Sequence, residues 1–241
     1  MENPIYVALS RQMALRRQLD VVSNNIANMN TTGFKQQRML FTEMVQRPGL
    51  HEKISFVQDR AVVRDLSNGP LTQTGNPLDL ALTGHGYFTV DTVNGPRYTR
   101  AGSFQLNDQR QLVDGGGLPV LADDGQPITI PVGTTDIKVT GDGTVATELG
   151  PVGRLNIVTF PNEQLMTEVG AGLYVSDEEP QPAPPETKVA QGLLENSNVK
   201  PVVEMTAMIE IQRQYQSAQR LVESEHERMR TAIQRLGRTT V

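Results

Sequence analysis

The stretch IYVALSRQMALRRQLDVVSNNIANM, residues 5–29, largely decides the fold, because its apolar positions recur at alternating spacings of three and four residues. The same spacing returns near the other end, in MIEIQRQYQSAQRLVESEHERMRTAIQRL, residues 208–236. Such a repeat keeps one narrow apolar stripe on one side of a helix. Only Gln12 and Glu225 interrupt the stripes. We expect a helix at each end, with each stripe buried against the other, the middle of the chain or a neighbouring copy.

Start and stop signals bound both helices. Asn3 and Pro4 suit the first turn of a helix that runs over about residues 4–29, and Gly33 lies beyond its end. The second helix is expected to begin near residues 198–201 and to end at Leu236, before Gly237. At 1.5 Å per residue these helices would be roughly 40 and 50 Å long. Helices of this length suit the wall of a bundle.

The segment between the helices has the pattern of short strands and turns. Residues 87–90 and 98–100 flank Asn94-Gly95, which is a strong hairpin signal. Further strands are expected at 104–106 with 111–113, at 137–140 with 144–146, and at 154–160. Turn signals this frequent indicate a meander, a sandwich or a partly open barrel. The fold class is therefore α+β, with terminal helices around a central all-β domain.

The composition divides the chain into four parts. We expect the N-terminal helix in residues 1–33, an extended connector with turns in 34–75, a β-rich domain in 76–193 and the C-terminal helix in 194–241. Residues 177–187, DEEPQPAPPET, are acidic and proline-rich, so they should form an exposed loop.

Composition and charge exclude several classes of function. The 241 residues include no cysteine, which rules out disulfides and thiolate metal sites. No long apolar run and no signal-like start is present, so we expect neither membrane insertion nor a cleaved signal peptide. The net charge of −5 is the sum of +3 for residues 1–40, −9 for 41–194 and +1 for 195–241. An acidic middle makes nucleic acid an improbable partner.

No motif points to catalysis, a cofactor or a metal. His51, His85 and His226 are far apart and lack the spacing of a metal site. The clusters 123–125 and 141–143 lack the ligand pattern of a calcium loop and read as tight turns. We therefore expect a protein that is not an enzyme.

Two terminal stretches carry a family likeness. Residues 19–35, LDVVSNNIANMNTTGFK, resemble the N-terminal signature of the bacterial flagellar rod and hook proteins, and residues 193–222 resemble their C-terminal signature. Residues 75–88 and 98–104 are similar to the opening of that family's β-domain. The short length and the opening residues 5–10 look most like the proximal-rod member, with the distal-rod subunit as the alternative. Arg11 stands where the family often has Gly.

The resemblance implies a structural subunit of the basal-body rod that polymerises into a torque-transmitting shaft. It implies that the terminal helices pair as a coiled coil and face neighbouring subunits, which are copies of this chain or other rod proteins. It also implies export by the flagellar type III apparatus into the periplasm-spanning rod. The residues expected at subunit interfaces are Ile5, Leu15, Leu19, Val22, Asn24, Asn25, Ile26, Asn28, Gly33, Phe34, Met205, Met208, Ile209, Ile211, Arg213, Tyr215, Val222, Met229 and Leu236.

A different class of function stays open from the residues alone. A secreted β-rich protein that binds or hydrolyses carbohydrate, with helical ends for oligomerisation, would share this pattern of elements. Hydrolysis would need a pair of carboxylates on the β-domain, and no such pair can be assigned from the sequence.

Overall fold

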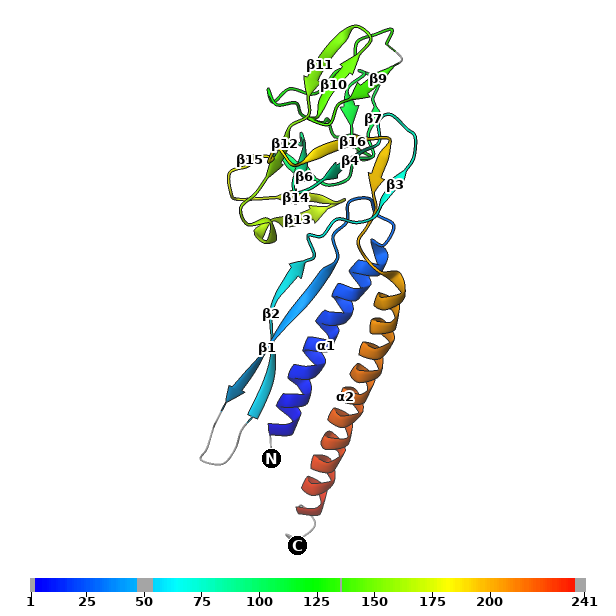
Figure 1. Ribbon diagram of the computed structural model, residues 1–241. Helices are drawn as coiled ribbons and strands as arrows, with labels where there is room; N and C mark the ends of the chain where they lie inside the picture. The colour runs from blue at the N-terminus through cyan, green and yellow to red at the C-terminus, as the bar shows by residue number, and fades with distance from the viewer. Residues whose placement is uncertain (1–2, 47–53, 135, 237–241) are drawn as a thin grey trace. The chain divides into compact units, whose positions relative to one another are not determined.

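The computed structural model describes residues 3–46, 54–134 and 136–236, which divide between two compact units (Figure 1). The helical unit draws on Met1–Ala27, Gln37–Arg64 and Lys200–Val241, and the β unit on Asn28–Gln36 and Asp65–Val199. The chain therefore passes between the units at 27/28, 36/37, 64/65 and 199/200. These divisions differ from the four consecutive parts expected from composition, because each unit is assembled from segments far apart in sequence.

The helical unit contains two helices and one β-ribbon. Helix α1 spans Asn3–Ala27, and helix α2 spans Pro201–Leu236, which confirms the predicted C-terminal helix. Strands β1 (Gln37–Gln46) and β2 (Ile54–Arg64) form an antiparallel pair with an irregularity between Leu40 and Phe41. Helix α1 contacts α2 and both strands. Much of the expected connector at 34–75 is thus a long ribbon that borders α1.

Helices α1 and α2 bury their apolar stripes against each other. Leu15 and Val22 from α1 form one cluster with Ile211 and Ala218 from α2, and all four side chains are buried. Burying a side chain of this kind contributes roughly 1.5–3 kcal/mol for the larger residues. Helix α2 has 36 residues and α1 has 25, so α2 is about 16 Å longer at 1.5 Å per residue.

The β unit is built from short antiparallel strands. Its largest sheet has six strands in the order β13-β14-β6-β5-β12-β15, and the order has two ends, so this sheet is open. Smaller sheets pair β11-β10-β9, β16-β4, β17-β3 and β7-β8. The strands are β3 (Leu71–Gln73), β4 (Leu80–Thr83), β5 (Tyr87–Val90), β6 (Arg97–Thr99), β7 (Gln105–Leu106), β8 (Leu112–Val113), β9 (Ile137–Val139), β10 (Thr144–Thr147), β11 (Gly150–Arg154), β12 (Ile157–Thr159), β13 (Thr167–Gly170), β14 (Leu173–Val175), β15 (Gln181–Pro182), β16 (Lys188–Gln191) and β17 (Leu193–Glu195), with the short helix η1 at Glu163–Leu165.

The predicted hairpins are confirmed. Strand β5 pairs with β6 across Asn94-Gly95, β7 pairs with β8, and β9 pairs with β10. One expectation needs correction: within the loop at 177–187, residues Gln181–Pro182 form β15, which pairs with β12. The short strand adds an edge to the six-stranded sheet, and most other residues of the loop are exposed or half-buried.

Aliphatic and aromatic residues fill the core of the β unit. Phe88 and Phe104 lie edge to face with ring centroids 5.1 Å apart inside the main cluster. A second cluster is mostly aromatic and contains Tyr87, Tyr98 and Tyr174. Edge-to-face pairs of this kind add about 0.5–1.5 kcal/mol beyond the area that they bury. The β unit therefore has its own core, as an independent domain requires.

Candidate functional site

A buried asparagine links three elements of the helical unit. The Nδ2 group of Asn25, near the end of α1, donates to the carbonyl of Gln37 at 2.8 Å and to Oε2 of Glu204 at 3.1 Å. The amide N–H of Gln37 donates in return to Oδ1 of Asn25 at 2.9 Å. Asn25 is 1% exposed, so these three bonds satisfy an amide that would otherwise be costly to bury. We call Asn25, Gln37 and Glu204 the asparagine clasp.

Three charged side chains lie buried together in the β unit. Glu195 accepts from Nζ of Lys35 at 2.7 Å and from Nε of Arg100 at 2.8 Å, and all three side chains are 5% exposed or less. The same carboxylate accepts from the amide of Gly69 at 2.9 Å, and its backbone carbonyl accepts from the amide of Gly33 at 2.8 Å. We call Lys35, Arg100 and Glu195 the charge cluster.

The remaining donors of the charge cluster bond to backbone oxygens, and Arg100 also donates to Oδ1 of Asn68 at 2.9 Å. Arg100 donates to the carbonyls of Leu82, Gly84 and Gly86, and Lys35 donates to the carbonyl of Ser67 at 2.9 Å. Buried ion pairs hold a fold only when such additional hydrogen bonds satisfy the rest of their polar groups. The charge cluster meets this condition and fixes five separate chain segments.

Burial and charge act in opposite directions on the pKa values of this cluster. For Glu195, burial raises the pKa, but the charges of Arg100 and Lys35 outweigh it, so the pKa lies below its usual range. For Lys35, burial is the largest effect and lowers the pKa, and the charge of Arg100 acts in the same direction, so together they outweigh the opposing effect of Glu195. Glu195 is therefore the anion on which both cations depend.

Asn198 ties together the segments that lead out of the β unit. Its side chain accepts from the amide of Gln36 at 2.6 Å and donates to the carbonyls of Asp65 and Ser67 at 2.9 and 3.0 Å. Its own amide donates to the carbonyl of Phe34, and the amide of Asp65 donates to the carbonyl of Gln36. The segments that run to the crossings at 36/37, 64/65 and 199/200 are thus bonded to one another inside the β unit.

Gly33 occupies a position that no other residue fits. Its φ angle is +71°, as the predicted turn at the helix exit requires. A Cβ atom at this position would lie 2.5 Å from the carbonyl carbon of Arg100, which is a backbone atom. Gly33 therefore allows residues 28–36 to lie directly against the backbone of Arg100 and Ala101, just after β6.

The predicted interface residues fall into distinct environments. Leu15, Val22 and Ile211 are buried between α1 and α2, where Leu19, Ile26, Met208 and Tyr215 flank them. Within the chain these residues pack against one another, as one of the expected arrangements has it, and their contact with other subunits stays a prediction. Asn25, Gly33 and Phe34 are buried, Asn24, Asn28 and Val222 are half-buried, and Met205, Ile209, Arg213 and Met229 are exposed. Ile5 and Leu236 have side chains outside the described ones.

A second apolar stripe runs along the outside of α2. Val202, Met205 and Ile209 are spaced by three and four residues and are 77, 45 and 53% exposed. They lie on the side of the helix opposite Ile211, as the periodicity of 3.6 residues per turn requires. On α1, Leu9 and Met13 are exposed in the same way. These five residues, which we call the outer stripe, are apolar surface that the chain itself leaves open.

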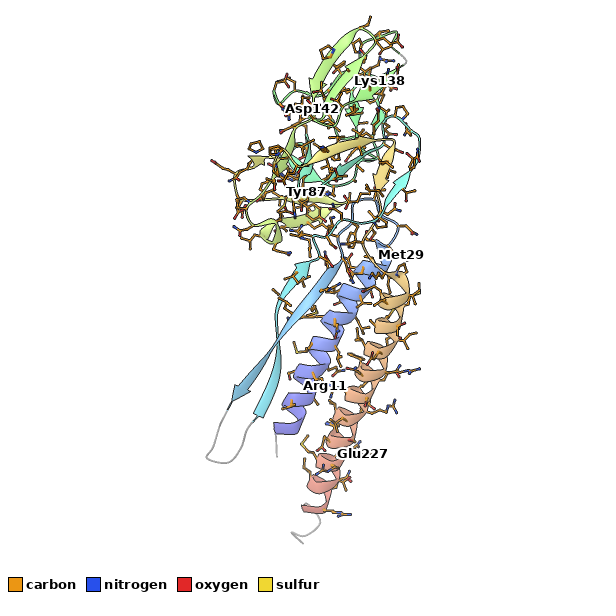
Figure 2. The ribbon with its side chains drawn as sticks, viewed as in Figure 1. Arg11, Met29, Tyr87, Lys138, Asp142 and Glu227 are labelled. Atoms are coloured by element: carbon orange, nitrogen blue, oxygen red, sulfur yellow. The ribbon has the colours of Figure 1, made fainter. Side chains whose placement is uncertain are left out.

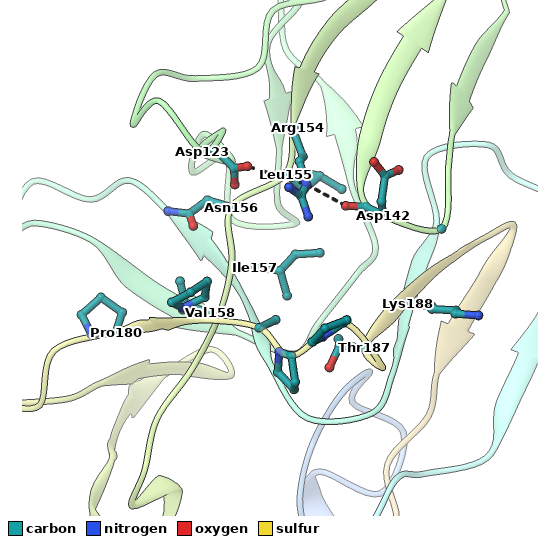
Figure 3. A pocket seen from close by; sticks show the side chains of 15 residues that line it. Asp123, Asp142, Arg154, Leu155, Asn156, Ile157, Val158, Pro180, Thr187 and Lys188 are labelled. Atoms are coloured by element: carbon teal, nitrogen blue, oxygen red, sulfur yellow. Dashed lines mark hydrogen bonds and ion pairs between the residues drawn. The ribbon is translucent and has the colours of Figure 1, made fainter.

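A cavity of about 810 Å³ lies in the β unit, and Asp123 and Asp142 are the acidic residues that line it (Figure 3). Arg154 lies at its rim, where its Nε donates to the carbonyl of Asp142 and pairs with Asp123 at 3.7 Å. Hydrogen bonds from Thr140 and Thr144 lower the pKa of Asp142 to about 2. Asp142 is therefore ionised at neutral pH and does not suit the role of the acid that donates a proton in glycoside cleavage.

Two further features bear on function. Within residues 3–46, 54–134 and 136–236, no group of three or more histidine and acidic side chains is placed to hold a metal ion. Neither helix, over its described residues, is long and apolar enough to span a membrane.

The sequence motifs contained the clustered polar residues without indicating their contacts. Lys35, Arg100, Glu195, Asn198 and Glu204 all stand in the stretches that resemble the flagellar family, yet none was among the expected interface residues. The one indication in the sequence was a charged or amide side chain within an otherwise apolar or turn-forming motif. Periodicity could not show that these side chains are buried against partners far along the chain.

Three family models match separate parts of the chain. "Flagella basal body rod protein" matches residues 5–35, "Flagellar hook protein FlgE/F/G D1 domain" matches 81–147, and "Flagellar basal body rod FlgEFG protein C-terminal" matches 190–235. The matched regions include residues of both the asparagine clasp and the charge cluster.

Full-length relatives agree with these matches. The chain is 41% identical over 244 residues to a protein named "Flagellar basal-body rod protein FlgF" from Caulobacter vibrioides, covering 99% of each chain. It is 35% identical to the protein of the same name from Mesorhizobium japonicum, covering 98% of this chain and 99% of the relative. It is 34% identical to "Flagellar basal-body rod protein FlgG" from Bacillus subtilis, covering 92% of this chain and 95% of the relative.

Proposed function

This chain belongs to the flagellar basal-body rod protein family, and from that premise we propose how it is built into the rod. It is a structural subunit of the flagellar basal body, of the proximal-rod type, since its relatives named FlgF match over their full length. It is a component of a motility structure, and the rod family implies assembly with other rod proteins.

The outer stripe is the observation that carries the proposed mode of assembly. Val202, Met205 and Ile209 expose apolar surface on the same helix whose opposite side is already buried against α1. Exposed apolar patches of this kind are typical of protein interaction sites. We infer that α1 and α2 pair as a coiled coil and that their outer stripes dock on helices of adjoining rod subunits. Such contacts join different patches and therefore propagate as a helical array.

The polar clusters suit a subunit that carries load. The backbone segments that cross between the helical unit and the β unit join the two covalently, so load on one unit acts on these segments. In the β unit those segments are bonded to one another through Asn198 and the charge cluster, and in the helical unit the asparagine clasp holds Gln37. We infer that the clasp and the cluster transmit torque without unravelling the chain. We further infer that the chain reaches the periplasm-spanning rod through the flagellar type III export apparatus.

Truncation at the boundary between the units tests the assembly role. A variant that lacks residues 1–27 keeps the whole β unit, so it should fold in that unit but be absent from purified basal bodies. A variant that lacks residues 1–36 also loses Lys35 and Gly33, so its β unit should be unstable. Incorporation of the first variant at the level of the full chain would refute the assembly role of α1.

Point substitutions test the outer stripe without removing a helix. Met205→Glu with Ile209→Glu places two carboxylates on exposed positions, so the monomer should keep its stability while incorporation is lost. Thr206→Glu with Glu210→Gln is a control for substitution itself, since it alters neighbouring exposed positions outside the stripe without changing the net charge. Equal incorporation of the stripe variant and the control would contradict the proposed docking surface.

A further inference from the structure

Three arginines surround a groove between the two helices. The groove has a volume of about 540 Å³ and is lined by Arg11 of α1 together with Arg213 and Arg220 of α2. Within the described part of the chain these arginines make no hydrogen bond or ion pair. All three are exposed, and no acidic residue lines the groove. Among the side chains that line it, the groove is therefore a concentrated positive surface without a carboxylate.

The acidic groups nearest to the groove do not neutralise it. Glu210 and Glu223 lie on α2 three residues before Arg213 and three residues after Arg220, and Asp20 is the one acidic residue among the described residues of α1. Glu223 accepts instead from Gln219 at 3.2 Å. A guanidinium that faces only solvent contributes little, whereas a carboxylate that docks beside several of them gains charge-assisted hydrogen bonds.

Four of the other residues that line the groove have small side chains. They are Ala8, Ser217, Ala218 and Ser224, and Gln214 and Leu221 complete the lining. Small residues let the backbone of another helix approach closely, and a groove between two paired helices accepts a third helix along its length. The shape therefore fits a helix with acidic residues on one face.

The chain carries such a helix farther along α2. Glu223 and Glu227 are exposed one turn apart, about 6 Å along the axis, whereas Arg213 and Arg220 are about 10 Å apart. Glu227 has no hydrogen-bond or ion-pair partner in the described part of the chain. Figure 2 shows Arg11 on α1 and Glu227 closer to the C-terminal end of α2. The two carboxylates can thus fit between the two guanidinium groups of another molecule.

We propose that the groove formed by Arg11, Arg213 and Arg220 binds the α2 segment that carries Glu223 and Glu227 of a second copy of this chain. This inference rests on the proposed function as a rod subunit. The basic groove and the acidic segment are different patches displaced along one helix, so the contact is heterologous and passes from copy to copy without closing. It sets the axial offset between adjacent copies, which apolar stripes alone specify weakly.

Reversal of charge tests the pairing. Arg213→Glu with Arg220→Glu, and separately Glu223→Arg with Glu227→Arg, should each reduce incorporation into purified basal bodies by about tenfold or more, because like charges then meet. The variant with all four substitutions should return to within about threefold of the wild-type level. Arg97→Glu with Lys138→Glu in the β unit makes the same change in net charge as the groove variant and should incorporate normally.

Each contrary result has a separate meaning. A groove variant that incorporates like wild type would overturn the inference. Loss in the groove variant with normal incorporation of the acidic variant would show that another anionic partner occupies the groove, which overturns the assignment to a second copy. The assignment to a second copy would also be overturned if the variant with all four substitutions did not regain incorporation while Arg213→Lys with Arg220→Lys incorporated normally. Absence of the wild-type chain from basal bodies would instead defeat the proposed function itself.

Discussion

Glu195→Gln removes the one anion from the charge cluster while keeping the shape of the side chain. Lys35 and Arg100, whose side chains are 5 and 4% exposed, would then face each other as buried cations without a carboxylate. Removing one partner of a buried ion pair costs about 3–5 kcal/mol, and here two cations lose the same partner. We therefore expect the free energy of unfolding of the β unit to fall by about 4–5 kcal/mol. That is a large part of the 5–15 kcal/mol that is usual for a folded domain.

Urea denaturation of the full chain measures this loss. The chain has no tryptophan, but Tyr87, Tyr98 and Tyr174 are buried together in the β unit and report on its unfolding by near-ultraviolet circular dichroism. Asp136→Asn is the matched control, because its carboxylate pairs with Lys138 on the surface and should change stability by less than about 0.5 kcal/mol. A loss below about 1 kcal/mol for Glu195→Gln would refute the argument that the cluster holds the β unit together.

Three further predictions concern single positions. Gly33→Ala should lower the free energy of unfolding, measured by urea denaturation, by about 3 kcal/mol, because it adds a steric clash to an unfavourable φ. Gly75 has a φ of +75° but open space around it, so Gly75→Ala should lower the free energy of unfolding by only about 1 kcal/mol. Asn25→Ala should speed amide exchange at Gln37 by about tenfold or more, since that N–H loses its acceptor; unchanged exchange would contradict the clasp. The pKa of Glu195 is lower in the folded than in the unfolded chain. Ionised Glu195 therefore contributes fully to the free energy of unfolding above the unfolded pKa of about 4.5, and this contribution is lost as the pH falls below that value. The urea midpoint should therefore drop between about pH 5 and pH 3, and this part of the drop should be absent in Glu195→Gln.

Local patterns in the sequence predicted the local structure. The spacing of apolar residues placed α2, and Asn94-Gly95 placed the β5–β6 hairpin, because both signals act within a few residues. The positive φ at Gly33 followed from a turn at the helix exit. Each of these features depends on neighbours in sequence, which a single chain displays directly.

Features that depend on distant partners were not predictable. Lys35 and Glu195 are 160 residues apart, and Arg100 and Glu195 are 95 apart, so no spacing rule joins them. The β1–β2 ribbon was expected to be a connector, because its stability depends on contact with α1. The basic groove could not be predicted from the sequence either, since Arg11 and Arg213 line the same groove only when α1 and α2 pair.

We propose that adjoining subunits complete the helical unit, whereas the β unit is complete in one chain. Hydrogen–deuterium exchange can be compared between the dilute monomer and purified basal bodies. We expect at least about hundredfold slower exchange for amides of α1 and α2 in the basal body, with little change at the buried strands β5 and β6. Equal protection of both helices in the dilute monomer and in the basal body would contradict it.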